Sequence, residues 1–178
     1  MAGILFIALC LLLCPSPLSL LLAAAVHEAG HLTVAAILGW ERPRAALSPF
    51  GLRLEYRAHH RCPESIAVAL GGSIFGLLAT LLPFLPRALR FYSLGFALIN
   101  LLPVQGLDGG GALLALLELF CLPDRAFFAA ERVSLITVLL IWLCVTAAEL
   151  KLGVNLPVLL ATVYLTAVSL SKKGGRRS

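Results

Sequence analysis

Long apolar runs separated by short breaks dominate the sequence. Residues 18–39 form the first run that can cross a bilayer as a helix, because a hydrocarbon core needs about 20 apolar residues. Residues 2–14 are also apolar but short for a span, and Pro15 and Pro17 interrupt any helix that continues from them. The pattern therefore predicts a short or incompletely spanning first helix and a full second helix that ends at Gly39.

Further apolar segments fill most of the remaining chain. They cover residues 64–85, 88–121, 126–148 and 153–171, and the second of them is broken at Pro103. With the broken segment counted as one span, the sequence predicts an all-α integral membrane protein of about six transmembrane helices.

A stretch of different character, residues 40–62, interrupts the apolar pattern. Within residues 52–57 apolar and charged side chains alternate, which is the period of a half-buried strand. The sequence Ser-Pro-Phe-Gly at 48–51 precedes this alternation and is typical of a turn. We therefore expect a short interfacial β-hairpin near residues 44–57, either as a purely structural element or as a strand edge that extends a substrate segment by backbone hydrogen bonds.

The composition is that of a chain that resides in lipid. Of its 178 residues 60% are hydrophobic and 13% are charged, about half the charged fraction of a soluble domain, and the mean hydropathy is +0.98. We expect one polytopic membrane domain, residues 1–171, followed by a basic tail, residues 172–178. The net charge of +5 comes from arginines and lysines in loops and tail, which indicates contacts with anionic lipids rather than with nucleic acid.

The basic residues also predict the orientation of the chain. In a six-span arrangement the loop 40–62, the turn near Arg125 and the tail fall on one side and hold most of the arginines and lysines. Because loops rich in arginine and lysine stay in the cytoplasm, both termini are expected to be cytoplasmic. His31 then lies about two helical turns inside the cytoplasmic face.

The candidate chemistry begins with His27, Glu28 and His31, which all fall within the span 18–39. Two histidines four residues apart share one helical face and suit zinc, which binds neutral imidazole nitrogen. Glu28 lies roughly 100° round the helix and can reach a water whose pKa the zinc lowers. Ionisable groups within a span indicate function by default; the alternative is a buried polar cluster that pins two helices without a metal.

A third ligand has to come from the few carboxylates of the chain. Asp108 follows the helix break and precedes three glycines, which let backbone approach a metal or a partner helix closely. The other carboxylates lie at loops or span ends, or lack such a setting: Glu41, Glu55, Glu64, Glu118, Asp124, Glu131 and Glu149. We therefore predict that His27, His31 and Asp108 hold one Zn²⁺ ion with one coordination position open.

Two motifs together resemble the site-2 protease family of intramembrane zinc metalloproteases. The first, His-Glu-Ala-Gly-His at 27–31, matches H-E-x-x-H, and the second, Asn-Leu-Leu-Pro-Val-Gln-Gly-Leu-Asp-Gly at 100–109, matches N-x-x-P-x-x-x-x-D-G. The resemblance implies the same three ligands. It also implies that Glu28 is the general base and that Asn100 binds the substrate backbone or the developing oxyanion.

The resemblance further implies a minimal family member, similar to the stage IV sporulation membrane proteases but without a PDZ or CBS domain. Such a protein resides in the lipid bilayer of a bacterial cell and cleaves a peptide bond in or near a transmembrane segment of a membrane protein substrate. A regulatory membrane protein is a further candidate partner. The alternatives are a non-catalytic pseudoprotease scaffold that retains membrane partners, and a transporter, which would need inverted repeats that we do not find.

Three features also allow simpler interpretations. Asn100 can bond the end of a broken helix instead of a substrate. The segment Gly71-Gly72-Ser73 loosely resembles the third-span motif of the family, but glycines within a span more often serve close helix packing. His59 and His60 with Cys62 suggest a second metal site, although their place in an arginine-rich loop favours a solvated surface.

Overall fold

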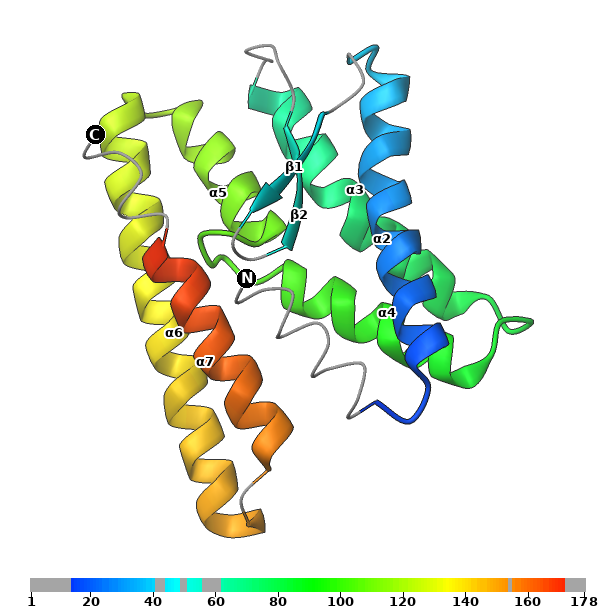
Figure 1. Cartoon of the computed structure of the whole chain (residues 1–178). Helices are drawn as coiled ribbons and strands as arrows, with labels where there is room; N and C mark the ends of the chain where they lie inside the picture. The colour runs from blue at the N-terminus through cyan, green and yellow to red at the C-terminus, as the bar shows by residue number, and fades with distance from the viewer. Residues whose placement is uncertain (1–13, 41–43, 49–50, 56–61, 154, 172–178) are drawn as a thin grey trace. The chain divides into compact units, whose positions relative to one another are not determined.

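Six helices and two strands make up the part of the chain that the computed structural model describes, residues 14–40, 44–48, 51–55, 62–153 and 155–171 (Figure 1). The chain divides into two compact units between Leu101 and Leu102. Residues 2–13 of the expected first helix and the whole basic tail lie outside the described residues. The expected single domain stays a prediction.

The first described helix of the first unit is α2 (Pro17–Ile37). A proline opens it, at a position where the missing N–H would have no intrahelical partner. At the other end Gly39 takes a left-handed φ of 72°; its N–H donates to Ala36 O at 3.1 Å, and the Trp40 N–H donates to Ala35 O at 2.9 Å. This Schellman arrangement satisfies the last carbonyls of the helix and suits glycine. The apolar run and the helix thus stop at the same glycine.

Helices α3 (Cys62–Leu81) and α4 (Arg87–Asn100) pack against α2 and against each other. Small side chains make up much of their shared core, and four of them are buried alanines: Ala23, Ala35, Ala79 and Ala97. Small residues let helix backbones approach closely, which is a common way for helices to associate in lipid. The first unit is therefore held together mainly by close backbone approach.

The third predicted span, residues 64–85, is shorter in the structure. Helix α3 ends at Leu81, and the chain turns before α4 begins. Pro83 explains the early end, because a proline disfavours the helical conformation at the preceding residue and has no N–H to donate. The prediction was wrong for the last turn of this helix.

Two short strands, β1 (Arg44–Ser48) and β2 (Gly51–Glu55), follow α2 in the chain and pair antiparallel. Arg44 lies opposite Glu55, and Ser48 lies opposite Gly51. Strand β2 falls on the stretch in which apolar and charged residues alternate, and the last two residues of that stretch, 56–57, lie outside the described residues. Among the described residues each of the two strands pairs only with the other, so each keeps one edge for further backbone pairing.

The second unit contains α5 (Asp108–Glu118), α6 (Pro123–Leu152) and α7 (Leu156–Ser171). Helix α6 contacts both of the others. The indole N–H of Trp142 on α6 donates to Thr166 Oγ1 on α7 at 2.8 Å. Such side-chain hydrogen bonds stabilise helix pairs in an apolar surrounding, where neither group meets water.

Three of the described helices are long and apolar enough to cross a membrane: Pro17–Ile37, Pro63–Leu81 and Pro123–Lys151. Helix α4 has 14 residues and α5 has 11; at about 1.5 Å per residue, α4 covers only ~21 Å of a ~30 Å hydrocarbon core. The expected broken span 88–121 is two separate helices, and the prediction of about six spans is not confirmed. The chain is a helical membrane protein, and its described part holds three long apolar helices.

Candidate metal centre

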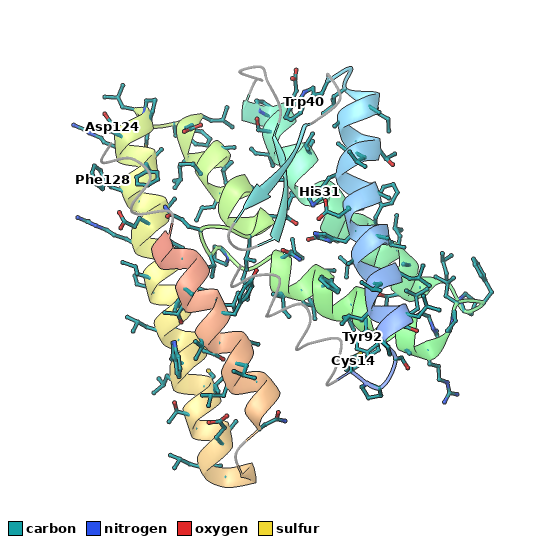
Figure 2. All side chains as sticks on the ribbon, viewed as in Figure 1. Cys14, His31, Trp40, Tyr92, Asp124 and Phe128 are labelled. Carbon is teal, nitrogen blue, oxygen red and sulfur yellow. The ribbon has the colours of Figure 1, made fainter. Side chains whose placement is uncertain are left out.

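His27 and His31 lie on one face of α2 and are both buried, with 5% and 9% of their surfaces exposed (His31 is labelled in Figure 2). Their Nε2 atoms are 3.3 Å apart, and their ring planes are nearly perpendicular, at 88°. Two nitrogen ligands at ~2.0–2.1 Å from one tetrahedral zinc ion are separated by ~3.3–3.4 Å. The two imidazoles therefore fit a shared zinc ion, with Nε2 as the ligand atom of each.

Helix α3 fixes the orientation of His31. The Nδ1 atom of His31 lies 2.7 Å from the carbonyl oxygen of Val68, a buried residue of α3. A carbonyl oxygen can only accept a hydrogen bond, so Nδ1 carries the proton and Nε2 presents its lone pair. Metal-binding histidines commonly have such a partner on the second nitrogen, because it sets both the tautomer and the ring orientation.

The crossing of α2 and α3 is built from glycines. A Cβ atom added at Gly30 would lie 2.9 Å from Gly72 Cα, and one added at Gly71 would lie 2.9 Å from Gly30 O. A Cβ atom added at Gly72 would overlap His31 Nε2 and lie 2.8 Å from the Cε1 atoms of His27 and His31. Cβ atoms essentially never make contacts this short. The packing interpretation of these glycines is confirmed, and at Gly72 the packed neighbours are the two imidazole rings.

Helix α4 supplies Phe96 and Asn100 to the first unit. The ring centroid of Phe96 lies 6.2 Å from that of His27, with the two planes inclined at 33°. The half-buried Asn100 donates an Nδ2 hydrogen to Phe96 O at 3.0 Å, one turn earlier in its own helix. This local bond is the simpler role expected for an asparagine near a helix end. It uses one of the two amide hydrogens, so a role for Asn100 towards a substrate stays a prediction.

Glu28 is exposed on α2, although its neighbour His27 is buried. One residue along a helix is a rotation of about 100°, which explains why the carboxylate leaves the face that the histidines share. An exposed carboxylate on a helix that spans a bilayer is costly unless it meets water or a polar partner. This face of α2 is therefore where water or another polar partner would be expected.

Asp108 is the first residue of α5 in the second unit, where a carboxylate is stabilised by the positive end of the helix dipole. The turn before it folds back under the helix. A Cβ atom added at Gly110 would overlap the Val104 carbonyl oxygen and lie 3.0 Å from Gln105 N, whereas one at Gly111 would meet nothing within 4 Å. Gly110 thus permits a close backbone approach, and the approaching backbone is this turn rather than the expected metal or partner helix. The role of Asp108 as third ligand stays a prediction.

The contacts of Val68 and Phe96 with the histidine pair were not predicted from the sequence. Val68 acts through its main-chain carbonyl, so its side chain carries no signal. An aromatic residue in an apolar helix is equally uninformative, and only the packing of α4 beside α2 brings Phe96 near His27. His59 and His60 lie outside the described residues, so the suggestion of a second metal site there stays a prediction.

A buried pair of convergent histidines on a long apolar helix is a candidate metal centre in a membrane protein. The chain matches no protein-family model. It is 32% identical over 133 residues to stage IV sporulation protein FB of Bacillus subtilis (strain 168), a match that covers 67% of this chain and 45% of the relative. The chain thus spans less than half the length of that protein.

The fold is similar to that of the site-2 protease from Methanocaldococcus jannaschii. The TM-score is 0.70 at 16% sequence identity, and the match covers 98% of this chain and 87% of the other. At that identity the likeness concerns the fold. The likeness in fold and the sequence match to the sporulation protein both support the resemblance that the two motifs carry. The chain belongs to the site-2 protease family.

Proposed function

We propose that this chain is an intramembrane zinc metalloprotease that hydrolyses a peptide bond in or near a transmembrane segment of a membrane protein. The observation that supports this most strongly is the His27–His31 pair, with its Nε2 atoms 3.3 Å apart and His31 oriented by Val68 O. His31 presents its Nε2 lone pair, and the separation of the two Nε2 atoms matches that of two ligands on one tetrahedral zinc ion. Membership of the site-2 protease family supports the same chemistry.

The proposed ligand set is His27 and His31 from α2 and Asp108 from the start of α5. Two neutral imidazoles and one carboxylate form a donor set that catalytic zinc sites use, and they leave a fourth position open. When bound, zinc would polarise the scissile carbonyl and lower the pKa of a water molecule. The residues of this chain have to supply the proton transfers and the binding of the substrate.

Glu28 is the proposed general base. Its carboxylate takes a proton from the attacking water and later gives that proton to the nitrogen of the leaving amine. Asn100 is proposed to donate its second amide hydrogen to the substrate backbone or to the developing oxyanion. A peptide bond within a helix is shielded, so the substrate has to be extended, and we propose that a free edge of the β1–β2 pair does this by backbone hydrogen bonding.

The proposed setting is a bacterial cell membrane with both termini in the cytoplasm. Residues 1–171 would act as one protease domain and residues 172–178 as a basic tail at the lipid surface. The substrate is a membrane protein, and a regulatory membrane protein is a further proposed partner. Labelling of a cysteine placed in the tail, on intact cells and on opened cells, tests the orientation.

Asp108→Ala is expected to lower the affinity for zinc by at least about tenfold, because one of three protein ligands is lost. Asp124→Ala is the matched control, since Asp124 also lies in the first turn of a helix but is exposed (Figure 2). Zinc affinity of the purified chains, measured by competition with a chelator, gives the comparison. Equal affinities of the two variants would contradict the proposed ligand set, and a wild-type chain without zinc would favour the non-catalytic scaffold.

A further inference from the structure

Ser134 and Ser169 form a buried polar contact between two helices of the second unit. Ser134 on α6 is 1% exposed and Ser169 on α7 is 8% exposed, and their Oγ atoms lie 3.0 Å apart. The backbone N–H of Gln105 donates to Ser134 Oγ at 2.9 Å. Because Ser134 Oγ accepts from the amide, its own hydrogen is available to Ser169, and the three groups form a continuous chain.

This chain of hydrogen bonds ends on the turn that precedes Asp108. The turn is closed by the Leu107 N–H, which donates to Val104 O at 3.0 Å, and by Gly106, with a positive φ of 108°. Val104 is fully buried, and its carbonyl lies directly under Gly110 of α5. A shift of the turn would therefore move the first turn of α5, and Asp108 with it.

We propose that Ser134 and Ser169 act as a serine clamp that positions the Asp108 turn. Neither residue belongs to a motif of the family resemblance, and both lie in helices that follow those motifs in the chain. Through this clamp, helices α6 and α7 help to set the position of Asp108, the proposed third ligand. The proposal rests on the proposed function, because it concerns the position of a ligand for zinc.

The chain offers a matched control for this proposal. Trp142 Nε1 donates to Thr166 Oγ1, so that Thr166→Val removes a different hydrogen bond between the same two helices. That bond does not involve the Asp108 turn. A change caused by loosening of α6 from α7 would occur in both variants, whereas a change caused by the clamp would occur only in Ser134→Ala.

The experiment measures two quantities on the full chain in detergent: the hydrogen exchange of the Gln105 amide and the affinity for zinc by chelator competition. In Ser134→Ala we expect the amide to exchange about tenfold faster, since its acceptor is lost, and zinc to bind about tenfold more weakly, as for other partners that orient a ligand. Ser134→Thr, which keeps the hydroxyl, should restore both. Thr166→Val should leave both unchanged and lower only the unfolding temperature.

Two results would overturn the clamp. One is unchanged Gln105 exchange in Ser134→Ala, and the other is fast exchange with wild-type zinc affinity. If Ser134→Ala fails to fold, Ser169→Ala tests the same hydrogen bonds from their far end. It should change amide exchange and zinc affinity in the same direction but by less. A wild-type chain that binds no zinc would overturn the proposed function instead. The exchange rate of the Gln105 amide alone would then test whether Ser134 holds the turn.

Discussion

Glu28→Gln is expected to abolish proteolysis and to leave zinc bound. Glutamine has nearly the same shape as glutamate but cannot take the proton of the attacking water, and loss of a general base costs about 10²–10⁴-fold in rate. Because Glu28 is exposed on α2, the substitution removes no buried contact, so the fold and the histidine pair should persist. The variant should therefore hold a substrate without cleaving it.

The same variant can also be used to find a substrate for this measurement. Membrane proteins that remain bound to Glu28→Gln during purification can be identified by mass spectrometry, and one of them, carrying a tag, can be co-expressed with the wild-type chain. Glu118→Gln is the charge-matched control, because Glu118 is exposed at the end of α5 and has no proposed role. Wild-type cleavage by Glu28→Gln would contradict the mechanism.

Gly72→Ala is expected to disturb the proposed metal centre through a residue that supplies no ligand to it. The added Cβ atom would overlap His31 Nε2 and press on Cε1 of His27. The helices cannot separate easily, since Gly30 and Gly71 already bring their backbones together, and the ring of His31 is fixed by Val68 O. Overpacking of this kind costs about 1–3 kcal/mol of stability, and the displaced rings should lower zinc affinity by about 10–100-fold.

Gly95→Ala is the control for Gly72→Ala. Gly95 lies in α4, and a Cβ atom added there would meet nothing within 4 Å. Alanine in a helix interior is favoured over glycine by about 0.5–1 kcal/mol, so this variant should be as stable as the wild type or slightly more so. Thermal unfolding in detergent and chelator competition give both quantities. A Gly72→Ala variant with wild-type stability and zinc affinity would refute the steric role of Gly72.

The sequence was informative wherever a residue acts through its own side chain at a fixed spacing. His27 and His31 share a helical face because they are four residues apart, and Gly39 ends α2 because of its backbone freedom. The break before Asp108 was also predicted, since Pro103 cannot continue a helix. These features depend on local geometry alone.

Features that depend on packing between distant segments could not be predicted. The carbonyl of Val68 orients His31 only because α2 and α3 cross at their glycines. The contact of Ser134 with Ser169 joins two residues 35 positions apart, and a lone serine in an apolar helix gives no sign of its partner. The number of spans stays a prediction, because an apolar run does not reveal whether its helix crosses the bilayer fully.

Zinc K-edge X-ray absorption on the purified wild-type chain tests whether His27 and His31 bind zinc together. We predict one zinc ion per chain, with two imidazole nitrogens at ~2.0–2.1 Å and oxygen ligands completing the shell. Zinc should be lost from His31→Ala. A wild-type chain without zinc, or a spectrum with no imidazole scattering, would contradict a zinc ion shared by the two histidines.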